Sequence, residues 1–320
     1  MNDIISHYSL NNKSPLTRLC ISIFIILFVG MFIFFLAFLA GVLVYGVDTA
    51  IVKESLLTGT SDKNIGFVRY LMISQCISFF IIPSIIILNL LKPVHQKGMM
   101  NFKTPLFYEF ALVILLAFCI IPITSFIGQL NSGIQFPDWL SGVEKWMTEK
   151  EDSADSLIGK LIISDNFWIM MLNLIIIAVL PAIGEELIFR GVFQKIFYGF
   201  FKSGHPAIWI TSFLFSALHF QFFGFLPRFI LGLVFGYLFF WSGTLWLSII
   251  AHFVNNAVAV LGAYIKGAEY INSSNDIDLW KQMVGLIIPL IAGTLILLYF
   301  RNKSKANSAG ELNQSGIEDV

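Results

Sequence analysis

The stretch NFWIMMLNLIIIAVLPAIGEELIFR, residues 166–190, decides the fold of this chain. Most of it is continuously apolar, and it is long enough to cross the hydrocarbon core of a bilayer, which takes about 20 residues as an α-helix. It does not alternate between apolar and polar residues, which disfavours a membrane strand. The stretch nevertheless ends in two glutamates and an arginine, which are costly at membrane depth and usually serve function there. We therefore expect a transmembrane helix whose charged side chains have a function.

The rest of the 320-residue chain has the same apolar character. Apolar residues make up 57% and charged residues 12%, against about 45–50% and about 25% in an average soluble chain. The 20 basic and 20 acidic residues give a net charge of +0 and form no basic block, which excludes nucleic acid as a partner. The composition predicts an all-α integral membrane protein, a bundle of about eight transmembrane helices with an intramembrane active site. The predicted spans are 19–45, 67–91, 107–130, 166–190, 206–222, 225–241, 244–265 and 282–300.

These spans predict the organisation of the chain. The first apolar run is longer than the roughly 7–15 residues of a signal-peptide core, so we expect it to remain as an anchor. Residues 131–165 mix apolar and charged positions and predict a short amphipathic helix at the interface, as a cap over the bundle or a gate for substrate. The predicted parts are a cytoplasmic N-terminal tail (1–18), three transmembrane helices with the extracytoplasmic amphipathic segment (19–165), a catalytic core of four helices (166–265), a last transmembrane helix (266–300) and a disordered C-terminal tail (301–320).

The distribution of basic residues predicts the orientation. An even number of spans places both termini on one side, and that side carries more Lys and Arg than the other. The loops at 92–103 and 195–202 are basic and contain no acids. The positive-inside rule then places both termini in the cytoplasm, with the lipid bilayer as the surrounding partner.

Ionisable side chains gather in the second half of the membrane region. Glu186 and Arg190 are four residues apart with the acid first, the favourable order for an intrahelical pair. At 1.5 Å per residue, Glu185 and His219 lie about equally far from the turn that joins their helices, and His252 reaches nearly the same level. The candidate site residues are Glu185, Glu186, Arg190, Phe215, His219, His252 and Asn256.

These side chains are suited to two chemistries. In the first, Glu185 acts as a general base with His219 on a water that attacks a carbonyl, and His252 and Asn256 donate hydrogen bonds to the developing oxyanion. In the second, Glu185, His219 and His252 bind Zn²⁺, which activates the water. The chain has no HExxH motif, so zinc has no standard local signature. We expect that no cofactor is required, with zinc as the alternative.

Three motifs in order resemble a known family. Residues 185–190 match EExxxR, residues 215–219 match FxxxH, and residues 252–256 match HxxxN. Together they resemble the CAAX-protease and bacteriocin-processing family of intramembrane endopeptidases, also called the Abi or CPBP family. The resemblance covers about 166–262, and the spans before and after this segment carry no matching motif.

The resemblance implies an endopeptidase that hydrolyses a peptide bond of a membrane-associated protein or peptide. It implies that Glu185 and His219 activate water, that His252 and Asn256 form the oxyanion site, and that Glu186, Arg190 and Phe215 have supporting roles. Members are often labelled metalloproteases, although a metal-free glutamate mechanism is favoured for the CAAX branch. The resemblance also favours a bacterial cytoplasmic membrane as the location.

Structural and non-proteolytic alternatives remain at this level. Glu186 and Arg190 could form a purely structural ion pair, and each histidine could serve only as an interhelical hydrogen-bond donor. Chains of Glu and His inside membranes also carry ions, which would make the protein a transporter or proton relay. A non-catalytic immunity or scaffold protein on the same fold is the other alternative, because a fold does not fix a function.

Overall fold

The computed structural model describes residues 10–46, 65–91, 104–134, 136–267 and 279–315, and within these ranges all regular structure is helical. The predicted all-α architecture is therefore confirmed. The elements are η1 (Leu10–Asn12), α2 (Pro15–Tyr45), α4 (Ile65–Gln75), η3 (Cys76–Ile81), α5 (Ile82–Leu90), α6 (Phe107–Ser132), η4 (Asp138–Leu140), α7 (Ser141–Ile162), α8 (Phe167–Asn173), η5 (Leu174–Val179), α9 (Leu180–Glu186), η6 (Leu187–Phe193), α10 (Gln194–Phe201), α11 (Gly204–Ala217), α12 (Phe225–Ser242), α13 (Leu245–Lys266), α15 (Leu279–Gly285) and α16 (Ile287–Ser315).

Long apolar helices make this a multi-pass membrane protein. Across the described ranges, 7 helices are long and apolar enough to span a bilayer. They are Pro15–Tyr45, Ile65–Leu90, Phe107–Asn131, Phe167–Phe201, Phe225–Ser242, Leu245–Lys266 and Lys281–Asn307.

One predicted span, 206–222, is shorter than expected. Its helix, α11, has 14 residues and ends at Ala217, so it covers only about 21 Å at 1.5 Å per residue. The chain then turns through residues 218–224, where Phe220 adopts a positive φ of 52°. This turn, here called the His219 loop, replaces the last part of the predicted span and carries the candidate histidine out of the helix.

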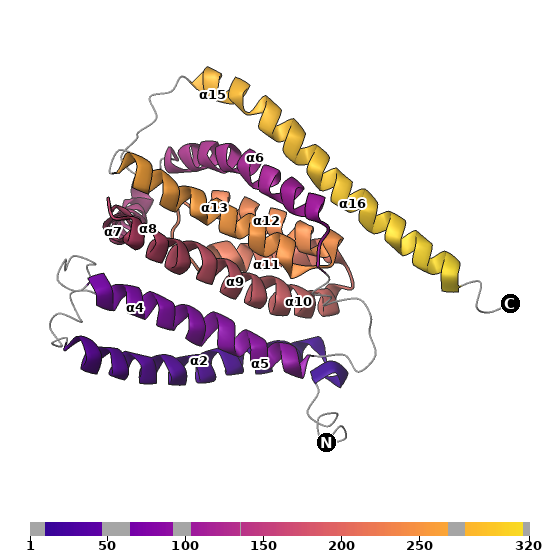
Figure 1. Cartoon of the computed structure of the whole chain (residues 1–320), viewed down its shortest axis with the longest axis horizontal. Helices are drawn as coiled ribbons and strands as arrows, with labels where there is room; N and C mark the ends of the chain where they lie inside the picture. The colour runs from indigo at the N-terminus through magenta and orange to yellow at the C-terminus, as the bar shows by residue number, and fades with distance from the viewer. Residues whose placement is uncertain (1–9, 47–64, 92–103, 135, 268–278, 316–320) are drawn as a thin grey trace.

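The helices pack side by side as a bundle (Figure 1). Helix α2 lies against α4, η3 and α5 along one side, while α16 lies against α6 and α12 on the other. Between them, α11 contacts both α10 and α12, and α13 contacts α6, η5 and α9. The start of α2 and the end of α16 lie at the same end of the bundle (Figure 1). The candidate residues of α9 and α13 are therefore held in the interior of the fold.

Three of the membrane segments in the described chain are π-helical rather than α-helical. They are η3, η5 and η6, and the last two flank α9 within the single long helix Phe167–Phe201. π-helical turns are rare and are frequently found at functional sites. The two candidate glutamates lie at the end of α9, directly before η6.

Two segments outside the core test further expectations. The amphipathic helix predicted within 131–165 is present as α7, Ser141–Ile162. The disordered tail predicted for 301–320 is wrong for residues 301–315, because α16 continues as a helix through Ser315. The sequence prediction took the polar composition of this segment as disorder, whereas the helix of the last span extends into it. Residues 316–320, and residues 1–9 of the predicted N-terminal tail, lie outside the described residues.

Candidate active site

Three elements distant in sequence bring Glu185, His219 and His252 together. Glu185 comes from α9, His219 follows the end of α11, and His252 comes from the middle of α13. The Glu185 Oε2 atom lies 3.8 Å from Nε2 of His219 and 3.9 Å from Nε2 of His252. Both histidines thus face the same carboxylate oxygen. That oxygen is buried and has no hydrogen-bond partner among the described residues.

The hydrogen bonds of the imidazole Nδ1 atoms indicate how the cluster is protonated. Nδ1 of His219 lies 2.6 Å from the carbonyl oxygen of Phe215, and because a carbonyl only accepts, Nδ1 carries the proton. Nδ1 of His252 lies 2.9 Å from Oε1 of Glu186 and donates in the same way to that carboxylate. In the neutral rings, both Nε2 atoms then have lone pairs aimed at another acceptor, the Glu185 carboxylate. The carboxylate and the two ring nitrogens are thus acceptors that face one another.

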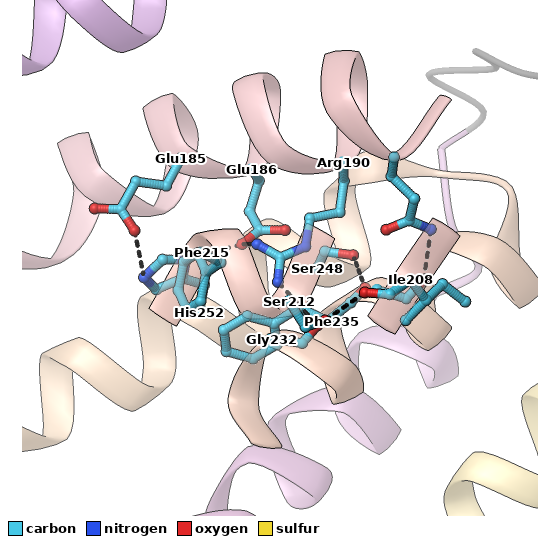
Figure 2. A network of polar contacts seen from close by, with 12 residues as sticks. Glu185, Glu186, Arg190, Ile208, Ser212, Phe215, Gly232, Phe235, Ser248 and His252 are labelled. Atoms are coloured by element: carbon cyan, nitrogen blue, oxygen red, sulfur yellow. Dashed lines mark hydrogen bonds and ion pairs between the residues drawn. The ribbon is translucent and has the colours of Figure 1, made fainter. Parts of the chain in front are cut away.

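Glu186 and Arg190 form a buried ion pair next to His252 (Figure 2). Nη1 of Arg190 donates to Oε1 of Glu186 at 2.7 Å, and both side chains are 0% exposed. Nη2 of Arg190 donates to the carbonyl oxygen of Gly232 on α12 at 2.9 Å. Oε1 of Glu186 therefore accepts from both Arg190 and His252. The predicted ion pair exists, and it also fixes the orientation of the His252 ring.

Phe215 and Phe235 pack against the Glu186–Arg190 ion pair and the histidines. The Phe215 ring lies edge-on to His219 and His252, with centroids 5.1 and 5.9 Å apart. Phe235 stacks on His252 with centroids 5.1 Å apart and an interplanar angle of 19°. The Arg190 guanidinium carbon lies 4.8 Å from the centre of Phe215 and 5.4 Å from that of Phe235. The sequence indicated Phe215 through its motif but gave no signal for Phe235, which lies within an ordinary apolar run.

Asn256 has different partners from the expected ones. Its Nδ2 donates to the carbonyl oxygen of Ile177 in η5 at 3.1 Å, and its Oδ1 accepts from Asn255 at 3.2 Å. Asn256 thus joins α13 to the π-helical segment before α9. Its recorded hydrogen bonds do not connect it to Glu185 or to either histidine.

A cavity of about 300 Å³ opens onto the Glu185–His219 side of the cluster. One wall comes from residues 176–219, and the other comes from α4 and η3 in the second span. The sequence motifs, which lie within residues 185–256, gave no indication of this second wall. The lining residues are Met72, Gln75, Cys76, Phe80, Ile176, Pro181, Glu185, Phe189, Leu218 and His219.

The arrangement of the cluster differs from a zinc site. Two ligands of one tetrahedral Zn²⁺ are about 3.3 Å apart when each lies about 2.0–2.1 Å from the metal. The separations of 3.8 and 3.9 Å from Glu185 to the histidines are larger. No group of three or more His, Cys, Asp and Glu residues in the described part of the chain is arranged to hold a metal ion.

Comparison with known proteins finds similarity over the part of the chain that carries this cluster. Residues 166–258 match the family described as type II CAAX prenyl endopeptidase Rce1-like, which is less than a third of the chain. The uncharacterized protein YpbD of Bacillus subtilis (strain 168) is 32% identical over 90 residues, which is 27% of this chain and 43% of YpbD. No solved structure matches the chain significantly. The match spans the elements that carry Glu185, His219 and His252, and it confirms over residues 166–258 the predicted resemblance to the CAAX-protease and bacteriocin-processing family.

Proposed function

We propose that this protein is an intramembrane endopeptidase that hydrolyses a peptide bond of a membrane-associated protein or peptide. The observation that carries the proposal is the convergence of Glu185, His219 and His252 within a segment that matches the Rce1-like endopeptidases. A carboxylate and two imidazoles inside a membrane helix bundle are expensive to maintain without a function. The cavity of about 300 Å³ that both Glu185 and His219 line gives a water room to contact the two side chains.

In the proposed reaction, Glu185 is the general base and His219 orients the water. One O–H bond of the water breaks and its proton passes to Glu185, while the oxygen forms a bond to the substrate carbonyl carbon. The C–N bond then breaks, and the leaving nitrogen takes the proton back from Glu185. Glu185 is suited to this role because its Oε2 has no other partner among the described residues.

His252 is the proposed donor to the oxyanion. It would donate from Nε2 as an imidazolium, and its Nδ1 is already held by the Glu186 carboxylate at 2.9 Å. That carboxylate compensates the positive charge, and Arg190 holds the carboxylate in place. Because its amide is engaged with Ile177, we assign Asn256 to the positioning of α13 rather than to the oxyanion.

The remaining details of the proposal concern cofactor and location. We propose that no metal is required, because Glu185 and the histidines can carry out each proton transfer. The rate of cleavage should then be unchanged after treatment with a zinc chelator, and a loss restored by added Zn²⁺ would contradict this. The proposed location is a bacterial cytoplasmic membrane with both termini in the cytoplasm, which the basic loops and the similarity to a Bacillus subtilis protein support.

The test compares peptide termini in membranes from cells that produce the wild type or the Glu185→Ala protein at matched levels. Glu149→Ala, on the exposed surface of α7, is the control for an acidic residue lost far from the cluster. Termini that appear with the wild type and Glu149→Ala, but not with Glu185→Ala, would support proteolysis and identify substrates. Identical termini from all three folded proteins would contradict it and favour the non-catalytic scaffold.

A further inference from the structure

The wall of the cavity opposite the catalytic residues lies outside the segment that matches the endopeptidase family. This wall comes from residues 72–80, whereas the match covers 166–258. The cavity next to Glu185 and His219 is thus lined in part by residues from outside the matched segment. Any preference for particular substrates is therefore expected to depend on the residues of α4 and η3.

Close packing next to Glu185 fixes the position of this wall. A Cβ atom on Gly184 would lie 2.9 Å from Cβ of Phe80 and 3.0 Å from Sγ of Cys76, so a larger residue would force η3 away from α9. The thiol of Cys76 also donates a hydrogen bond to the carbonyl oxygen of Leu180, at 3.2 Å. The wall is therefore held directly beside the catalytic carboxylate.

Gln75 is the side-chain amide on the cavity lining, which is otherwise mainly apolar. It lies near the middle of the candidate span Ile65–Leu90 and is exposed. Its amide makes no hydrogen bond to any other described residue. An amide without a partner is costly at membrane depth, where water is scarce. A glutamine amide both donates and accepts, which are the two capacities that pair with a peptide C=O and N–H.

We infer that Gln75 holds the substrate backbone in the cavity that it shares with Glu185 and His219, making Gln75 a substrate-binding residue contributed by the second span. The apolar neighbours Met72, Phe80 and Ile176 favour uncharged, apolar side chains on the bound peptide. This inference rests on the proposed endopeptidase function.

The test uses Gln75→Met, which keeps the length of the side chain and removes the amide. Gln282→Met at the start of the last span is the matched control. The probe is a quenched-fluorescence peptide, reconstituted with purified protein in lipid vesicles, whose sequence is copied from a terminus that appears only with active protein. An interaction made equally in the ground state and the transition state changes KM and leaves kcat unchanged. We expect Gln75→Met to raise KM about 3- to 10-fold, the effect of one hydrogen bond, and Gln282→Met to leave it unchanged.

Binding of the same peptide to the inactive Glu185→Gln protein gives a readout that needs no catalysis. Adding Gln75→Met to Glu185→Gln should weaken binding by the same factor. If Gln75→Met leaves both KM and binding unchanged while the wild type cleaves, the role of Gln75 is overturned and the proposed function stands. If membranes yield no terminus that depends on Glu185, the proposed function fails and this inference fails with it.

Discussion

At the scale of single residues, the buried Glu186–Arg190 ion pair orients a candidate catalytic ring, that of His252. Both side chains are fully buried and hydrogen-bonded to each other, and Glu186 also accepts from His252. Removing one partner of a buried pair leaves an uncompensated charge, which typically costs about 3–5 kcal/mol, whereas replacing both with apolar residues is often nearly neutral.

Arg190→Met should therefore lower the free energy of unfolding by about 3–5 kcal/mol. The double variant Glu186→Leu with Arg190→Met should recover most of this loss, because no charge remains unpaired. It should still be inactive, because His252 has lost the acceptor for its Nδ1. Unfolding in detergent and peptide cleavage would be measured on the same preparations. A double variant that is as unstable as Arg190→Met would contradict the burial argument.

Variants of His252 and Asn256 separate the oxyanion role from a packing role. His252→Ala should reduce kcat by about 10²–10³-fold, as expected for the loss of one oxyanion donor. Asn256→Ala should lower stability by about 1 kcal/mol through the lost bond to Ile177, with a much smaller effect on kcat. If the two folded variants lose kcat equally, Asn256 is assigned to the oxyanion site together with His252.

The sequence predicts which residues form the site better than it predicts the hydrogen bonds between them. Helical spacing and depth indicated that Glu185, His219 and His252 would meet and that Glu186 would pair with Arg190, and the structure shows both arrangements. The partners of the two Nδ1 atoms and of Asn256 depend on how helices rotate against one another, which one sequence does not specify. Gln75 did carry a signal, because it is one of two amide side chains, with Asn89, within an apolar span.

At the scale of elements, the sequence did not predict the π-helical segments. Residues 174–179 are all apolar, and residues 187–193 are apolar apart from Arg190 and Gly191, a composition that a regular α-helix also accommodates. A π-helical turn is selected by the packing of neighbouring helices, here on both sides of α9. The shortening of α11 has a similar origin, because the polar contacts of the His219 loop lie on other elements.

Helix α7 holds the His219 loop from outside. The backbone N–H of Phe223 donates to Oε2 of Glu151 at 3.3 Å, and the Trp146 and Phe222 rings are 5.1 Å apart. On the other side, Asn131 donates to the carbonyl oxygens of Phe222 and Phe223 at 3.1 and 2.5 Å. The loop that carries His219 is thus fixed by both α7 and α6.

The Glu151 contact predicts a specific dependence of stability on pH. Burial raises the pKa of Glu151 above its ordinary value, so the folded state binds the proton more tightly than the unfolded state. Its contribution to the free energy of unfolding is then largest below the ordinary pKa and decreases as the pH rises through the raised pKa. Glu151→Gln removes this titration. The wild type should lose thermal stability relative to Glu151→Gln as the pH rises across this window, and parallel curves for the two proteins would contradict the assignment.

At the scale of the whole molecule, the bundle predicts an experimentally accessible topology. The start of α2 and the end of α16 lie at one end of the bundle (Figure 1). The basic loops predict that α7 lies on the opposite face of the membrane. In a Cys20→Ser background, Asp152→Cys on α7 should react in intact cells with a membrane-impermeant maleimide. Asn302→Cys, in α16 just after the predicted span 282–300, should react only after the membrane is opened. The reverse pattern would overturn the proposed orientation while leaving the helix packing intact.

The central claim is that Glu185 acts as the base for peptide hydrolysis inside the membrane, and the rate of cleavage by purified protein in lipid vesicles tests it most directly. The substrate is a peptide whose cleavage in membranes depends on Glu185, and Glu185→Gln is compared with the wild type and with Glu149→Gln. Glu185→Gln preserves the shape of the side chain but cannot accept the proton, so it should lower kcat by about 10²–10⁴-fold. It should remain folded and bind the peptide, while Glu149→Gln should match the wild type. Cleavage by Glu185→Gln at the wild-type rate would contradict the account.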